Sequence, residues 1–281
     1  MTVTSAERQV PSADGTPIAY QSLGAGDGVI VVGGALRAAQ DYLPLAQALA
    51  HSFAVHVVDR RGRGASGPQG SAYSIGKESE DLLAVQAATG ATAVFGHSYG
   101  GLVALETARH TEVFSQVAVY EPAVSVDGSI RVDWMPRYRE LLAAGDTRGA
   151  FACMVRQMAA GSSPTAKMPL WYLRAILRLV IRERQWQHME PLLASSLTEH
   201  EQVGRLDDGT VDRYQSVTAR VLLLGGHKSA ASITTKLFDA LHDAIADCAV
   251  EILHGLDHNA PTEKGPQVIG NRVRRFLSSA D

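Results

Sequence analysis

The sequence predicts an α/β fold in which helices flank a mostly parallel central sheet and a helical segment is inserted late in the chain. Apolar runs and helical periodicities alternate up to residue 120, and the alternation returns after residue 217. Such alternation typically produces a parallel sheet with helices on both faces. Between these parts we find no convincing strand. We therefore expect a core formed by residues 1–122 and 218–281, and a helical cap, or lid, formed by residues 123–217.

The composition limits the class of protein. Of the 281 residues, 46% are hydrophobic and 20% charged, and the net charge is −3. These values argue against a disordered chain and against nucleic acid or a membrane as the main partner. No run reaches the roughly 18 apolar residues that would span a bilayer. Two cysteines and no apolar signal core at the N-terminus predict a cytoplasmic protein. The length of the chain allows a monomer, and the inserted segment could instead form a homodimer.

The elements of the first part follow from local patterns. A turn at residues 13–15 introduces a strand. Strands are predicted from short apolar runs over residues 16–23, 28–33, 53–58, 92–95 and 114–120. Helices are predicted from the spacing of apolar residues over 36–51, 75–88 and 100–109. Each helix follows a strand, as a parallel sheet requires.

The second part contains the insertion and the end of the sheet. Strands are predicted over 220–224 and 249–253, and helices over 231–246 and 264–277. Breaks at residues 161–164, Pro169 and Pro191 divide the insertion into helices. All three tryptophans lie there, so we expect Trp134, Trp171 and Trp186 to line a pocket for a hydrophobic small molecule. In the alternative interpretation they pack within an ordinary helical core.

One motif has direct chemical meaning. Gly96-His97-Ser98-Tyr99-Gly100 matches G-x-S-x-G and stands between a predicted strand and a predicted helix. A turn this tight strains the serine backbone and leaves no room for side chains at the glycine positions. It raises the Ser98 hydroxyl above the sheet and places the N-terminus of the next helix beside it. The motif predicts a nucleophilic serine.

With this motif the sequence resembles the α/β-hydrolase family over nearly its whole length, in the branch of serine esterases and lactonases. Three further segments resemble that family: Gly33-Gly-Ala-Leu36 after the second predicted strand, Asp59-Arg-Arg-Gly-Arg-Gly-Ala-Ser66 after the third, and Gly255-Leu-Asp-His-Asn-Ala-Pro261 after the last. The resemblance implies the α/β-hydrolase fold. The turn over 59–66 is expected to be structural, with Asp59 binding backbone N–H groups.

The family order places the general base downstream of the serine, which selects His258 in the loop after the last strand. The oxyanion hole is expected to use the backbone N–H of Tyr99 and that of Ala35, with Gly34 as a possible donor. Gly34 and Leu36 are also expected to contact the substrate. His97, inside the motif, is expected to line the pocket rather than to act as the base.

The usual acid of the family is missing. Its place after the strand over 220–224 reads Gly226-His-Lys-Ser229, and no carboxylate follows until Asp239. Glu121, at the end of the preceding strand, is our candidate for the acid. Some haloalkane dehalogenases and the fungal zearalenone lactonase place the acid at this alternative site. Asp257 is a weaker candidate, and Glu121 could instead cap a helix or anchor the lid.

These residues predict a serine hydrolase that cleaves an ester or lactone bond of a hydrophobic small molecule. The sequence contains neither a cluster with metal-ligand spacing nor a G-x-G-x-x-G fingerprint, so we expect no metal and no cofactor. Two alternatives stay open: a non-hydrolytic lyase or cyclase of secondary metabolism, and a receptor-like homologue with little turnover. Epoxide hydrolysis and dehalogenation would need an aspartate in place of Ser98.

Overall fold

The computed structural model describes residues 6–159, 164–229 and 231–279, and within them the chain forms one mixed sheet. The sheet has eight strands in the order β1-β2-β4-β3-β5-β6-β7-β8. The strands are β1 Ala6–Pro11, β2 Pro17–Leu23, β3 Gly28–Val32, β4 Ala54–Val58, β5 Ala93–His97, β6 Gln116–Tyr120, β7 Arg220–Gly226 and β8 Cys248–Leu253. Strands β1 and β2 run antiparallel to their neighbours, and all pairs from β4 to β8 are parallel.

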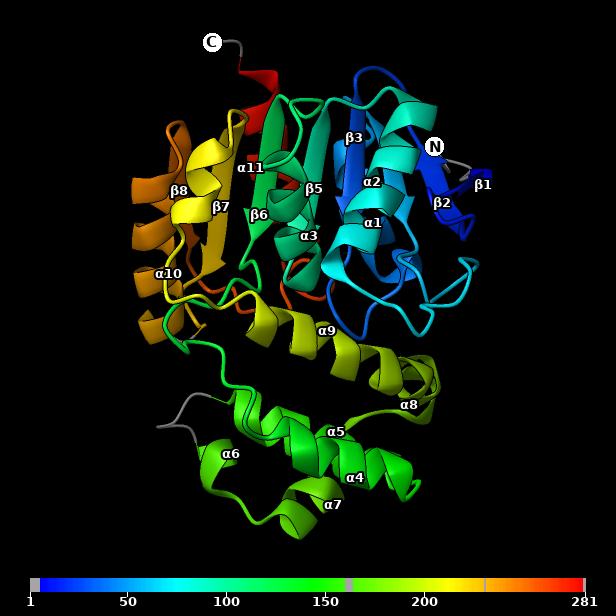
Figure 1. The fold of residues 1–281 in the computed structure, drawn as a ribbon, viewed down its shortest axis with the longest axis vertical. Helices are drawn as coiled ribbons and strands as arrows, with labels where there is room; N and C mark the ends of the chain where they lie inside the picture. Colours follow the sequence, from blue (N-terminus) through cyan, green and yellow to red (C-terminus); the bar gives the residue numbers. More distant parts are fainter. Residues whose placement is uncertain (1–5, 160–163, 230, 280–281) are drawn as a thin grey trace.

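Helices cover both faces of the sheet (Figure 1). Helices α1 (Leu43–Leu49) and α11 (Pro266–Ser278) pack against each other on one face. Helices α2 (Ile75–Thr89), α3 (Tyr99–Ala108) and α10 (Ala231–Ala244) lie on the other. Successive residues of a buried strand point to opposite faces. Accordingly Ile30 and Val32 join the apolar cluster of α2 and α3, whereas Val29 and Val31 join that of α1 and α11.

The segment between β6 and β7 is helical and lies beyond the carboxyl ends of the parallel strands (Figure 1). Its helices are α4 Met135–Ala143, α5 Thr147–Met158, α6 Pro164–Lys167, α7 Leu170–Val180, α8 Glu183–Met189 and α9 Leu193–Arg205, with short 3-10 turns at Glu190–Leu192 and Asp212–Ser216. Helix α9 lies nearest the sheet. The break predicted at 161–164 falls outside the described residues except at Pro164, which begins α6.

Two differences from the predicted elements have physical causes. The sequence pattern did not reveal β1, which is an exposed edge strand without a continuous apolar run. The helix expected from residue 36 instead begins with a 3-10 turn at Ala39–Tyr42, followed by α1. Leu36 has a φ of 56°, outside helical geometry, and the Asp59 carboxylate accepts a hydrogen bond from the Ala39 N–H at 2.8 Å. No helix among the described residues is both long and apolar enough to cross a membrane.

Candidate active site

Ser98 occupies the turn between β5 and α3 in a strained conformation. Its φ is 53°, a value that residues with side chains rarely adopt. The flanking glycines are required by packing. A Cβ atom at Gly96 would come within 2.5 Å of the Gly100 carbonyl oxygen, and one at Gly100 within 2.3 Å of the Val32 oxygen. The missing side chains let the start of α3 approach the end of β3, which brings the oxyanion loop, residues 33–36, next to Ser98.

Three side chains from distant loops form a hydrogen-bonded series. The Ser98 Oγ lies 3.1 Å from His258 Nε2, and His258 Nδ1 lies 2.7 Å from Glu121 Oε2. Ser98 and His258 are partly exposed, whereas the Glu121 side chain is 7% exposed. Asp257, the alternative acid, does not take this place, because His258 Nδ1 contacts Glu121 and the Asp257 Oδ1 instead accepts the N–H of Asn259 at 3.0 Å. The residues expected to be nucleophile, base and acid therefore lie in contact.

The protein holds Glu121 as an ionised acceptor. It directly follows β6 with a φ of 44°, so the chain turns sharply at this residue. Its Oε1 accepts the Gly226 N–H at 2.7 Å, which leaves Oε2 for His258. Burial alone would raise the pKa of Glu121, but the hydrogen bond and charge of His258, with smaller contributions from Ser229 and Gly226, lower it below its ordinary value. A charged carboxylate suits the stabilisation of an imidazolium.

The oxyanion loop is tied down on both sides of Gly34. Its N–H donates to the Tyr42 hydroxyl at 2.8 Å, so this N–H is already occupied. Its carbonyl accepts from Arg63 Nη1 at 3.1 Å. Tyr99 is the first residue of α3, where a backbone N–H has no acceptor within its own helix. Of the N–H groups considered for an oxyanion hole, those of Ala35 and Tyr99 therefore remain the candidates.

His97 connects the oxyanion loop to the histidine loop. Its Nε2 lies 2.9 Å from the His258 carbonyl oxygen, which only accepts, so Nε2 carries the proton. Nδ1 must then accept, and the Tyr42 hydroxyl donates to it at 2.6 Å. With both nitrogens engaged and 2% exposure, His97 supports the site and has no polar atom left for a substrate. On the neighbouring strand Tyr120 donates to the Asp257 carbonyl at 2.8 Å, a second tie to the same loop.

Acid should destabilise the protein through His97. Burial, and after it the charge of His258, holds the pKa of His97 well below the ordinary value of about 6.5. Below about pH 6.5 His97 is protonated in the unfolded chain but stays neutral in the folded chain. The contribution of His97 to stability is therefore fully present above this pH and decreases as the pH falls. We expect the melting temperature of the wild type to fall between pH 7 and pH 5, and His97→Asn to flatten this slope. His110→Asn, at an exposed turn, is the control, and equal slopes in both variants would contradict this assignment.

The three tryptophans have different surroundings. Trp134 and Trp186 are buried in the apolar cluster of the insertion, which also includes Tyr138 and Phe151. Trp171 is 73% exposed on α7 and stacks edge-on against Tyr172. Packing therefore accounts for Trp134 and Trp186 without a ligand. The insertion's cluster reaches the oxyanion loop at Leu36, which packs against it.

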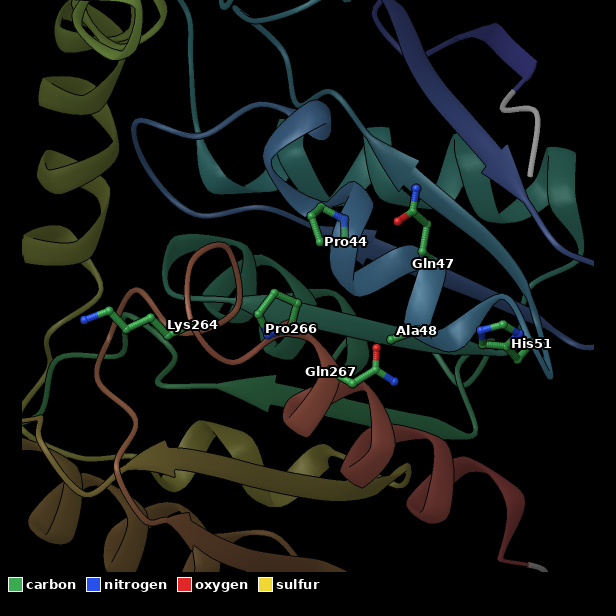
Figure 2. Close-up of a pocket in the computed structure, with 7 residues that line it drawn as sticks. All are labelled: Pro44, Gln47, Ala48, His51, Lys264, Pro266 and Gln267. Carbon is green, nitrogen blue, oxygen red and sulfur yellow. The ribbon is translucent and has the colours of Figure 1, made fainter. Parts of the chain in front are cut away.

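A surface pocket of about 410 Å³ lies between α1 and α11 (Figure 2). Its lining combines residues of both helices, of the turn after α1 and of the loop before α11: Pro44, Gln47, Ala48, His51, Lys264, Pro266 and Gln267. None of these residues belongs to the hydrogen-bonded series around Ser98. The series itself lies at the carboxyl edge of the sheet, away from this pocket.

Sequence reasoning missed the residues that support the site. Tyr42, Tyr120 and Arg63 all bind backbone groups of its loops. A tyrosine within a helix or at a strand end carries no local signal of such a role. For Arg63 the turn over 59–66 gave a hint, and Asp59 does bind the Ala39 and Ala65 N–H groups as expected.

The chain matches the model of the alpha/beta hydrolase family over residues 29–269. No curated protein matches it significantly. Among solved structures, an alpha/beta hydrolase from Sphaerobacter thermophilus DSM 20745 is 31% identical, with a TM-score of 0.81 and coverage of 96% of this chain and 100% of the other.

Two further structures have the same fold at lower identity. The enol-lactonase from Burkholderia xenovorans LB400 is 19% identical, with a TM-score of 0.70, and covers 97% of this chain and 100% of its own. The 2-hydroxy-6-oxo-6-phenylhexa-2,4-dienoate hydrolase from Rhodococcus sp. strain RHA1 is 17% identical, with a TM-score of 0.68 and coverage of 99% and 100%. At these identities the likeness concerns the fold alone.

Proposed function

The chain belongs to the alpha/beta hydrolase family, and we propose that it is a serine hydrolase that cleaves an ester or lactone bond of a hydrophobic small molecule. The observation that carries this proposal is the hydrogen-bonded series Ser98–His258–Glu121, with distances of 3.1 and 2.7 Å. Membership of the family alone would not establish the reaction, because one fold hosts many activities. The arrangement of nucleophile, base and acid supports acyl transfer, because each group has a role in that reaction.

The reaction follows from the roles of these groups. The Ser98 Oγ attacks the carbonyl carbon while His258 Nε2 takes the hydroxyl proton, and Glu121 stabilises the resulting imidazolium. The Tyr99 and Ala35 N–H groups stabilise the negative oxygen of the tetrahedral intermediate. The proton passes from His258 to the departing alkoxide, which leaves an acyl-serine. Water, activated by His258, then adds to the acyl group and releases the carboxylic acid and free Ser98.

An apolar substrate is supported by the surroundings of the oxyanion loop. Leu36 is half-buried and packs against the apolar cluster of the insertion. We propose that residues 123–217 act as a cap over the site and that residues 1–122 and 218–281 form the core. The fold accommodates lactone hydrolysis, as in the enol-lactonase. Epoxide opening is disfavoured, because the usual mechanism in this fold needs a carboxylate where Ser98 stands.

The test is the mass of the intact protein after treatment with a fluorophosphonate, a reagent for activated serines. We expect one adduct on the wild type and none on Ser98→Ala, because only a hydroxyl activated by an adjacent base displaces the fluoride at a useful rate. Ser125→Ala is a matched control, since this buried serine donates to Asp207 and has no part in the series. It should label like the wild type.

A folded wild type that forms no adduct would refute the hydrolase proposal. A lyase or cyclase, in which the serine does not acylate, or a receptor with little turnover would then explain the site better. If the wild type does form the adduct, a panel of esters and lactones would next define the acyl group of the substrate.

A further inference from the structure

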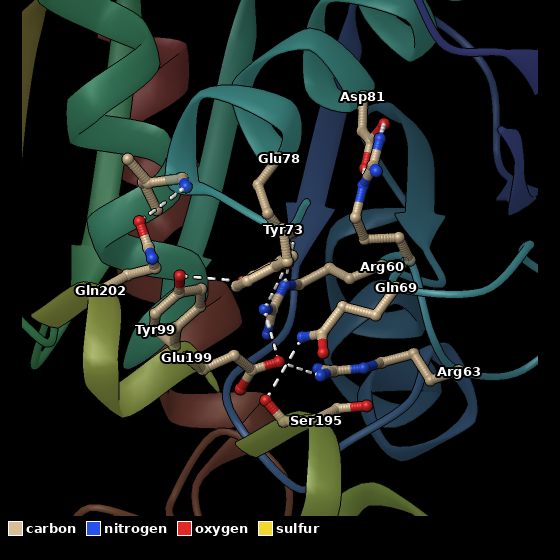
Figure 3. A network of polar contacts seen from close by, with 12 residues as sticks. Arg60, Arg63, Gln69, Tyr73, Glu78, Asp81, Tyr99, Ser195, Glu199 and Gln202 are labelled. Atoms are coloured by element: carbon tan, nitrogen blue, oxygen red, sulfur yellow. Dashed lines mark hydrogen bonds and ion pairs between the residues drawn. The ribbon is translucent and has the colours of Figure 1, made fainter. Parts of the chain in front are cut away.

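A buried ion-pair cluster, formed by Arg60, Arg63, Glu78 and Glu199 (Figure 3), contacts the oxyanion loop. All four side chains are at most 2% exposed. Two arginines face two glutamates, so the charges balance within the cluster. Burying these four charged groups costs much desolvation free energy, and a buried ion pair is weak evidence for a gain in stability. We therefore ask what the cluster does at this position.

The cluster joins three parts of the chain. Both arginines come from the turn after β4, Glu78 comes from α2, and Glu199 comes from α9 of the insertion. Arg60 binds Glu78 through two hydrogen bonds of 3.0 and 2.7 Å and reaches Glu199 at 2.8 Å. Arg63 pairs with the same Oε1 atom of Glu199. Glu199 is thus the carboxylate that holds Arg63 in place.

Both arginines also donate to the oxyanion loop. Arg60 Nη1 donates to the Gly33 carbonyl at 3.2 Å, and Arg63 Nη1 donates to the Gly34 carbonyl at 3.1 Å. The second contact concerns the peptide whose N–H belongs to Ala35. In a trans peptide the C=O and N–H bonds point in opposite directions within one plane, and the described residues contain no cis peptide. Fixing the Gly34 oxygen therefore fixes the direction of the Ala35 N–H.

The charge of the donor adds a second effect. A hydrogen bond from a guanidinium to a carbonyl is charge-assisted, and it polarises the peptide toward a more positive N–H. The preceding N–H, that of Gly34, is occupied by Tyr42. The next one along the loop is thus both oriented and strengthened. The loop itself adjoins Ser98, because a Cβ atom added at Gly34 would lie only 3.0 Å from the Ser98 Cβ.

We propose that Arg63, held by Glu199 of α9, is a positioning residue that orients and polarises the Ala35 N–H toward the oxyanion. The proposal rests on the proposed function, since it assumes an acyl or phosphonyl transfer at Ser98. It also gives the insertion a role in catalysis. Because Glu199 belongs to α9, a displacement of this helix would release Arg63 and loosen the oxyanion hole.

The experiment compares fluorophosphonate labelling kinetics in the wild type, Arg63→Lys and Glu199→Gln. Lysine keeps the positive charge but loses the planar fork that reaches Glu199 and Gly34 together. Glutamine keeps the volume but removes the charge that holds Arg63. Since loss of one oxyanion donor slows catalysis by roughly 10²–10³-fold, we expect a misdirected donor to slow labelling by about 10- to 100-fold.

The control is Arg61→Lys. Arg61 lies in the same turn, is 1% exposed and binds Asp81 through two hydrogen bonds of 2.7 Å, but it has no contact with the oxyanion loop. It should label like the wild type. Circular dichroism checks that every variant is folded at the assay temperature, and Glu199→Gln decides the matter if Arg63→Lys does not fold.

Two readouts separate positioning from a general loosening of the site. The limiting labelling rate should fall, while the reagent concentration for half-saturation and the pH midpoint of labelling should stay unchanged. In the wild type labelled with [¹⁵N]alanine, the Ala35 amide resonance should move downfield on phosphonylation, a measurement that needs no variant at this cluster.

The outcomes distinguish the two proposals. A wild type that forms no adduct refutes the proposed function and with it this inference. If the wild type labels but Arg63→Lys and Glu199→Gln label as fast as Arg61→Lys, the inference is overturned and the serine hydrolase stands. An unmoved Ala35 resonance in the phosphonylated wild type would overturn it as well.

Discussion

Substituting glutamine for Glu121 is expected to lower the turnover of an ester or lactone substrate by about 10⁴-fold, as the loss of charge in a triad acid does. In the wild type the Nδ1–H group of His258 donates to the Glu121 carboxylate, which leaves Nε2 free to accept from Ser98. A glutamine amide can donate to Nδ1 instead. The other tautomer would then carry its proton on Nε2 and could not act as the base.

A second substitution sharpens this test. Ser229 stands where the family usually has its acid, and it is close enough to lower the pKa of Glu121. Glu121→Gln combined with Ser229→Asp should recover part of the lost turnover, measured as kcat at saturating substrate. Asp257→Asn is the control and should keep nearly full activity. Full activity in Glu121→Gln, or a large loss in Asp257→Asn, would show that the acid lies elsewhere.

Replacing Arg60 by methionine should destabilise the fold by about 3–5 kcal/mol, because it leaves the buried carboxylates of Glu78 and Glu199 without a shared partner. Burial would raise the pKa of Glu78, but the charge and hydrogen bonds of Arg60 outweigh burial and lower it. Methionine fills much of the volume, so the lost charge dominates the effect. Urea denaturation measures the free energy of unfolding, and the melting temperature should fall on the order of 10 °C.

Two further variants test whether the loss of the buried ion pairs causes this destabilisation. Arg137→Met removes an exposed pair with Glu140, whose side chains are 59% and 65% exposed, and should leave the melting temperature unchanged within error. Adding Glu78→Gln to Arg60→Met should restore part of the stability, because it removes the buried carboxylate whose ion pair was lost, whereas Glu199 still pairs with Arg63. Equal midpoints for Arg60→Met and Arg137→Met would contradict the role given to the cluster.

Local patterns predicted most of the fold. Continuous apolar runs marked β3, β4, β5, β6 and β7, because strands buried on both faces have no polar side to interrupt them. The edge strand β1 escaped, since its exposed residues lack that signal. The start of α1 was misplaced because Asp59, twenty residues away, holds the Ala39 N–H in a loop.

By itself the sequence determined the order of strands and helices and the turn that presents Ser98, because periodicity and glycine-rich turns act over a few residues. Together with the resemblance to the α/β-hydrolase family, it also singled out His258 and Glu121, each of which follows a strand that must end at the same edge of the sheet. Only the tertiary structure decided which groups support them. The contact of Arg63 with Glu199 spans 136 residues, and that of His97 with the His258 carbonyl spans 161. Such contacts depend on how loops and the insertion pack together, and no local pattern encodes them.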